Sequence, residues 1–128
     1  MLRWLNVMMT LVFVLCVAVQ YNDPDALLWM LIYAYAVIVT GMAAANRYTV
    51  FVVIGCVGFF LGFLYLSPGF LEVSDPADLV TDIRMDEKGV EVAREAGGLL
   101  IVSLWLLVLS VVWYRRRGDQ ASRAADQE

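Results

Sequence analysis

Apolar residues along the chain gather into four long runs, which short polar segments separate. Each run approaches the roughly 20 residues that an α-helix needs to cross about 30 Å of hydrocarbon. The pattern therefore predicts an all-α fold, a four-helix transmembrane bundle. The predicted spans cover about residues 4–20, 24–45, 49–66 and 95–114.

The composition supports a membrane protein with one domain. Of the 128 residues, 62 % are hydrophobic and 17 % are charged, whereas soluble domains carry roughly 45–50 % apolar and about 25 % charged residues. We assign residues 1–117 to the membrane domain, which leaves no room for a soluble domain with its own core. The polar residues 118–128 are expected to form a disordered cytoplasmic tail.

The first apolar run follows Arg3, as in a secretory signal peptide. However, the sequence VAVQ at residues 17–20 has no small-x-small cleavage pattern. We therefore interpret this run as an uncleaved membrane helix.

The polar segment NDPD, residues 22–25, has the features of a helix start. Asp23 is a good N-cap, because its carboxylate can accept from the first free backbone N–H groups. Pro24 suits the first helical position, where no N–H is needed. Asp25 falls in the first turn, where the positive end of the helix dipole favours an acidic side chain.

A similar start, SDPADL, follows the third span. It predicts a short helix at about residues 76–85, on which Leu79, Val80 and Ile83 share one face. Such a face is typical of a helix that lies on the membrane surface. We therefore expect a short outer interfacial helix between the third and fourth spans.

The basic residues predict the orientation of the chain. Six of the nine fall at the N-terminus, in the second loop and in the tail: Arg3, Arg47, Arg115, Arg116, Arg117 and Arg123. The positive-inside rule then places both termini in the cytoplasm. We expect a multi-pass protein of the plasma membrane or the bacterial inner membrane. The run at residues 115–117 is interpreted as a stop-transfer anchor in preference to a site for specific lipids.

Glycines suggest where the helices pack closely. Gly58 and Gly62 form a GxxxG pair in the third span, a pattern that allows close approach of two helix backbones. We expect this pair to pack inside the bundle, with a homodimer face as the alternative. Gly97 and Gly98 are expected to let the fourth span approach its neighbours.

Several classes of chemistry are disfavoured by the residues present. The chain has no histidine, and Cys16 and Cys56 lie inside spans without a CxxC motif. These features argue against histidine-ligated haem and against thiol-oxidising enzymes. A proton-coupled exporter would need a carboxylate within the membrane, and the interiors of the spans carry none. We therefore expect no cofactor, no metal and no catalytic residue.

Polar residues gather at the predicted outer face, and these are the candidate site. They are Asn22, Asp23, Asp25, Glu91, Arg94 and Glu95. Three interpretations are open: a structural collar of caps and ion pairs, a binding site for a polar ligand or a partner protein, and a carboxylate-lined site for Ca²⁺ or Mg²⁺. Asp25 is the expected partner of Arg94, with Glu91 and Glu95 as competitors.

Two sequence stretches carry a resemblance to a known family. VQYNDPDALLWMLIY and REAGGLLIVSLW resemble the transmembrane protein 220 family, over roughly residues 5–116. The resemblance implies a small four-helix integral membrane protein. It implies no particular reaction, so it brings no catalytic residues to this chain.

We hypothesise a non-enzymatic accessory or interaction protein that binds partner proteins or lipid within the membrane. The alternative is a small oligomeric channel or carrier, in which the acidic outer mouth attracts cations. A membrane enzyme that uses the outer carboxylates is the third hypothesis. The expected surroundings are the lipid bilayer and either a membrane protein partner or further copies of the chain. Nucleic acid is not an expected partner.

The orientation can be tested by thiol labelling in intact cells. With Cys16 and Cys56 replaced by alanine, a cysteine introduced at Gly118 should resist an impermeant reagent. A cysteine introduced at Lys88 should react with it, because the positive-inside rule places that segment outside. The opposite labelling pattern would overturn the predicted orientation.

Overall fold

The computed structural model describes residues 1–22, 25–71 and 87–126. Four long helices account for most of them: α1 (Leu2–Val19), α2 (Ala26–Ala44), α3 (Phe51–Leu71) and α5 (Glu87–Ala125). A short 3-10 helix, η1 (Gln20–Asn22), follows α1. Each long helix is long and apolar enough to cross a membrane, which confirms the predicted all-α fold with four candidate spans. The interfacial helix predicted at 76–85 lies outside the described residues.

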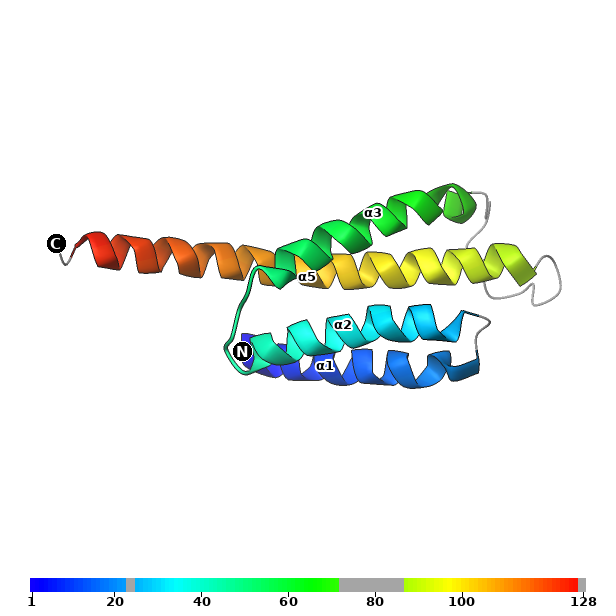
Figure 1. Cartoon of the computed structure of the whole chain (residues 1–128), viewed down its shortest axis with the longest axis horizontal. Helices are drawn as coiled ribbons and strands as arrows, with labels where there is room; N and C mark the ends of the chain where they lie inside the picture. Colours follow the sequence, from blue (N-terminus) through cyan, green and yellow to red (C-terminus); the bar gives the residue numbers. More distant parts are fainter. Residues whose placement is uncertain (23–24, 72–86, 127–128) are drawn as a thin grey trace.

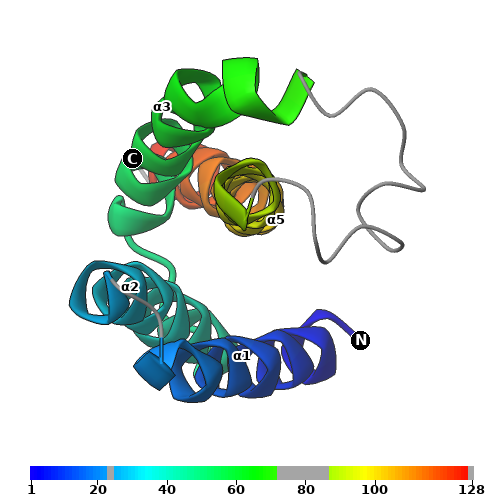
Figure 2. The same cartoon turned by 90° about the vertical axis from the view of Figure 1, so that its right-hand side faces the viewer.

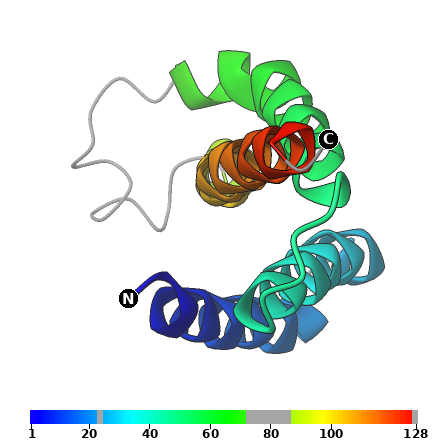
Figure 3. The same ribbon diagram turned by 90° about the vertical axis from the view of Figure 1, so that its left-hand side faces the viewer.

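The helices pack as two antiparallel pairs, α1 with α2 and α3 with α5. The two end views show α5 beside α3, with the α1–α2 hairpin as a second layer (Figures 2 and 3). The N-terminus and the α2–α3 connection lie at one end of the bundle, which we call the Arg116 end (Figure 1). The α1–α2 connection and the start of α5 lie at the other, the Glu95 end (Figure 1).

The α5 helix continues to Ala125, well beyond the apolar part of the sequence. The sequence prediction for residues 118–128 was a disordered tail, and the structure differs up to residue 125. The reason is composition: alanine, arginine and glutamine favour helices, and this segment contains no proline.

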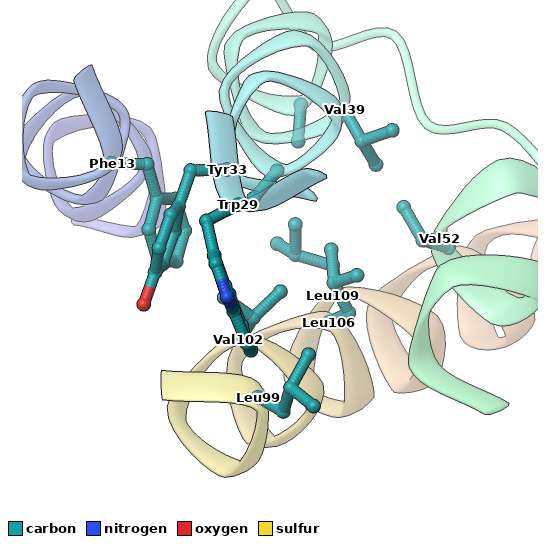
Figure 4. Packing of buried hydrophobic residues seen from close by; sticks show 11 residues of the cluster. Phe13, Trp29, Tyr33, Val39, Val52, Leu99, Val102, Leu106 and Leu109 are labelled. Atoms are coloured by element: carbon teal, nitrogen blue, oxygen red, sulfur yellow. The ribbon is translucent and has the colours of Figure 1, made fainter. Parts of the chain in front are cut away.

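The core lies between the two pairs, where apolar side chains recur on one face of each helix (Figure 4). The buried residues of this cluster lie on α5 at positions 99, 102, 106 and 109, and on α2 at positions 29, 33, 36, 39 and 43. Such spacings of three and four residues place side chains on one helix face. In lipid the hydrophobic effect does little to join helices, so the close fit of these side chains must hold the pairs together.

Helix α3 contains Pro68, which cannot donate a backbone hydrogen bond. The carbonyl of Leu64, four residues earlier, accepts instead from the hydroxyl of Ser67 at 2.8 Å. The helix therefore runs on to Leu71, a few residues past the predicted end of the third span.

The glycine contacts differ from the predicted GxxxG face. Gly58 is exposed, and a Cβ added there would meet nothing within 4 Å, so the predicted packing inside the bundle is wrong for this residue. Gly55 is buried, and a Cβ there would lie 2.5 Å from the ring of Tyr35 and 2.8 Å from Leu106. Gly62 faces Leu99. At 3.6 residues per turn, Gly62 lies about 20° around α3 from Gly55, whereas Gly58 is turned by about 60°.

Tyr35 cannot easily move away from Gly55. Its hydroxyl donates to the backbone carbonyl of Phe51 at 2.8 Å, and its ring meets that of Phe59 edge-on, with 5.4 Å between centroids. Gly55 therefore lets an aromatic side chain of α2 lie against the backbone of α3.

Gly55→Ala should destabilise the bundle, whereas Gly58→Ala should leave it unchanged or slightly more stable. Overpacking typically costs about 1–3 kcal/mol, while alanine favours a helix over glycine by about 1 kcal/mol. Thermal unfolding of both variants in the same detergent provides the measurement. Equal stabilities would show that Gly55 is not a close contact.

Candidate functional site

The structure brings part of the predicted outer-face cluster to one end of the bundle. The start of α2, after Asp25, and the early turns of α5, with Arg94 and Glu95, both lie at the Glu95 end (Figure 1). Asp25 and Arg94 are exposed, and Glu95 is half-buried. Asp23 and the side chains of Asn22 and Glu91 lie outside the described residues.

Asp25 occupies the N-cap position of α2, where its backbone carbonyl accepts from the amides of Leu28 and Trp29 at 3.0 and 3.3 Å. Its side chain makes no cap hydrogen bond. The helix thus begins at Ala26, two residues after the predicted start at Pro24. Because Asp23 and Pro24 are not described, their capping roles stay predictions.

In the described part of the chain, the structure shows no ion pair between the exposed side chains of Asp25 and Arg94, and their pairing stays a prediction. Consecutive positions on a helix point about 100° apart. Glu95, with the nearby buried Leu99 and Val102, is on the side of α5 that meets α2. Arg94 is turned to the exposed side.

Glu95 instead contacts an aromatic residue of α2. The indole Nε1 of Trp29 donates to Oε1 of Glu95 at 2.9 Å. Trp29 is only 5 % exposed, and a buried indole N–H usually needs an acceptor. Figure 4 shows its ring extending from α2 toward α5. The hydrogen bond to an ionised acceptor therefore joins the two helix pairs near this end.

Tyr33 lies one turn further along α2, with its ring centroid 6.5 Å from that of Trp29. Its hydroxyl lies so close to Gly98 that a Cβ there would collide with it. Gly98 thus approaches a neighbour as predicted, whereas a Cβ on Gly97 would meet nothing within 4 Å. The sequence analysis did not single out Trp29 or Tyr33. The available signal was their spacing of four residues, which puts both on one face of α2.

A cavity of about 360 Å³ opens beside these residues, between α1, α2 and α5. Its polar lining comes from Gln20, Tyr33, Arg94 and Glu95. Its apolar lining includes Cys16, Val19 and Ile101, with Gly97 and Gly98 completing the wall. The cavity thus combines charged and hydrogen-bonding groups with an apolar surface, as binding sites for amphiphilic molecules require.

Among the described residues, no group of three or more His, Cys, Asp and Glu side chains is placed to hold a metal ion. The cation-site interpretation included Asp23 and Glu91, so for these two it stays a prediction. At this end of the bundle Arg94 is exposed, and Glu95 is held by the hydrogen bond from Trp29.

The hydrogen bond between Trp29 and Glu95 can be measured by a double-mutant cycle. Trp29→Phe and Glu95→Met each remove one partner while preserving most of the side-chain volume. We expect the loss of unfolding free energy in the double variant to differ from the sum of the two single losses by at least about 1 kcal/mol, as for hydrogen bonds to charged groups. A control cycle of Trp29→Phe with Arg94→Gln should be additive. Additivity in both cycles would contradict the contact.

Comparison with known proteins supports the sequence resemblance. The family model described as transmembrane family 220, helix, matches residues 12–111. No curated protein and no solved structure matches the chain. The matched region runs from the middle of α1 to the apolar part of α5, so it contains the second and third candidate spans, parts of the first and fourth, and every residue that lines the cavity at the Glu95 end. The chain thus belongs to transmembrane family 220 and is a multi-pass membrane protein.

Proposed function

We propose that this chain is an accessory membrane protein that binds a phospholipid or a similar amphiphile in the cavity at the Glu95 end. The observation that carries the proposal is the lining of this cavity. Arg94, Glu95 and Gln20 supply polar groups, and apolar side chains lie directly beside them.

The charges at the cavity match the head group of a zwitterionic phospholipid. The guanidinium of Arg94 is exposed and suits a phosphate, for which arginine offers a planar set of N–H donors. Glu95 follows directly on the same helix and brings a carboxylate near a cationic group of the ligand. One cation and one anion at one rim favour a ligand that itself carries both charges.

The apolar side of the cavity is continuous with the surface that faces lipid. Val19 is 68 % exposed and Ile101 is 58 % exposed, and both line the cavity. An acyl chain bound there could therefore leave sideways along α1 and α5 without crossing a polar surface. This geometry favours a ligand supplied by the membrane over one supplied by the aqueous phase.

The predicted orientation of the chain decides in which leaflet of the membrane this cavity lies. With both termini in the cytoplasm, as the basic residues predict, the cavity at the Glu95 end lies in the outer leaflet. The site then binds lipid on the side of the membrane opposite to the arginine-rich tail.

No described contact favours the channel that we considered as the alternative. The space between the two helix pairs holds fully buried side chains such as Val102, Leu106 and Leu109. A pore would have to form between copies of the chain. Ion flux through liposomes that contain the purified protein would support the channel and contradict the accessory role.

Gly97→Leu should abolish binding of amphiphile at this cavity. The added side chain enters open space, so it should fill the cavity without disturbing the packing. We expect affinity for phosphatidylethanolamine, measured by native mass spectrometry in mild detergent, to fall by about tenfold or more, which corresponds to about 1.4 kcal/mol.

Gly58→Leu is the matched control, because a side chain there also enters open space but lines no part of this cavity. It should bind lipid like the parent protein. Equal binding by the parent, Gly97→Leu and Gly58→Leu would refute the proposed site. If the parent protein retains a co-purifying protein that the Gly97→Leu variant loses, the ligand of this cavity is a protein instead of a lipid.

A further inference from the structure

At the Arg116 end, the chain reversal after α2 places an asparagine with unusual geometry. The amide of Asn46 donates to the carbonyl of Ala43 at 3.0 Å, and the amide of Arg47 donates to that of Met42 at 2.8 Å. These bonds form a Schellman motif, in which the residue after the helix adopts a left-handed conformation. Asn46 does so with φ of 64°, a conformation that asparagine tolerates better than most residues.

The side chain of Asn46 holds an arginine of α5. Nη1 of Arg116 donates to Oδ1 of Asn46 at 2.6 Å. The same guanidinium lies over the ring of Tyr48, 4.4 Å from its centroid. The hydroxyl of Tyr48 in turn accepts from Nδ2 of Asn6 at 3.2 Å, and Asn6 is fully buried. Arg116 is therefore positioned by Asn46 and Tyr48 of the α2–α3 connection, and Asn6 of α1 in turn holds Tyr48.

Two cavities lie on either side of this arginine. The first, of about 420 Å³, is lined by Arg3, Asn46, Tyr48 and Arg116 together with apolar residues. The second, of about 400 Å³, has Asn46, Tyr48 and Arg116 in common with the first and adds Trp113, Arg117 and Gln120. Arg117 is itself held, because its guanidinium lies 4.9 Å from the centroid of the Trp113 ring. Both volumes fall in the range of small-molecule sites, roughly 300–1,000 Å³.

The charges in these cavities have one sign. Three guanidinium groups, those of Arg3, Arg116 and Arg117, line them, and among the described residues no Asp or Glu does. Arg116 is positioned by a neutral amide and an aromatic ring, so its positive charge is not compensated by these contacts. A guanidinium has five N–H donors, and the bond to Asn46 uses one. The remaining donors suit the oxygens of a phosphate, which arginine can bind through two parallel hydrogen bonds.

The position along the helix indicates where the phosphate comes from. Arg116 lies two residues past Tyr114, which closes the apolar span together with Trp113, and aromatic residues of this kind mark the level of lipid head groups. Val50 lines the second cavity together with Arg116 and is 47 % exposed, and Phe51, the next residue in the chain, is 52 % exposed, so the two offer an apolar surface for acyl chains. A membrane lipid presents its phosphate at this depth, whereas a soluble anion has no apolar part that contacts this surface.

We propose that the Arg116 end is a binding site for an anionic phospholipid, whose phosphate contacts Arg116 from one of these cavities. Arg3 and Arg117 contribute further positive charge from the two sides. The sequence alone favours an anchoring role for the run at 115–117. The structure distinguishes its members, because Arg115 lines neither cavity while Arg116 lines both. The site is separate from the cavity at the Glu95 end.

Arg116→Gln and Arg115→Gln provide a matched test, since each removes one positive charge from the same turn of α5. The full chain in mild detergent would be titrated with phosphatidylglycerol, and with phosphatidylcholine as the zwitterionic reference, by native mass spectrometry. Loss of one surface charge weakens general attraction to anionic lipid by about fivefold. Arg116→Gln should weaken phosphatidylglycerol binding at least about fivefold more than Arg115→Gln does. Equal losses would show diffuse attraction and overturn the proposal.

Asn46→Asp separates binding from folding, because Arg116→Gln also removes a structural hydrogen bond. Aspartate has the same shape, tolerates the left-handed conformation and still accepts from Arg116, so thermal stability should be kept. It nevertheless brings a negative charge into both cavities. Phosphatidylglycerol binding should fall by about tenfold or more, while phosphatidylcholine binding should not change. A variant that binds phosphatidylglycerol like the parent would refute the site.

Glycerol 1-phosphate distinguishes a lipid from a soluble phosphate. At the concentration of phosphatidylglycerol that half-saturates the protein, it should displace little of the lipid, because it lacks the acyl chains. Displacement at equal concentration would mean that the site binds free phosphate compounds and would overturn its assignment to lipid. Gly97→Leu should retain phosphatidylglycerol binding at the Arg116 end, so this proposal and the one for the Glu95 end can fail separately.

Discussion

The two helix pairs are joined through three aromatic side chains of α2 that reach across to the other pair. Trp29 donates to Glu95, Tyr33 lies against Gly98, and Tyr35 donates to the carbonyl of Phe51 while its ring lies against Gly55. In a membrane, apolar side chains gain little by leaving lipid for each other, so shape and polar contacts decide which helices associate. Each aromatic residue supplies both, with a large flat ring and a polar atom at its edge. The cavity at the Glu95 end lies where two of these contacts bring α2 and α5 together.

The fold was largely predictable because its main determinant is local in the sequence. Four apolar runs must become helices, since a helix satisfies its own backbone hydrogen bonds in lipid. Which faces of the helices meet depends on details that sequence spacing does not contain. Gly58 and Gly62 match a known packing pattern, yet the closest approach is at Gly55, because that glycine lies opposite Tyr35 and Leu106. Only the relative rotation of α2, α3 and α5 decides this.

The candidate site was predictable in location but not in its contacts. The positions of charged residues along the chain put Asp25, Arg94 and Glu95 at one end. The choice of partner depends on the side-chain directions of adjacent residues on α5. Glu95 is turned toward α2 and contacts Trp29, while Arg94 is exposed. The arginine run at residues 115–117 likewise shows that position in the sequence does not give the contacts of a side chain. The three arginines have different surroundings in the structure, and of the three only Arg116 contacts both Asn46 and Tyr48.

The extension of α5 has a mechanical consequence. From Arg115 to Ala125 the helix continues without a break past the apolar span, and at 1.5 Å per residue this segment is about 16 Å long. A continuous helix acts as a lever, so a small tilt of α5 inside the bilayer becomes a larger lateral displacement at its tip. Arg116 and Arg117 lie near the fulcrum of this lever. A change in the lipids around these arginines that tilts α5 would therefore change the direction of the polar segment from Arg115 to Ala125.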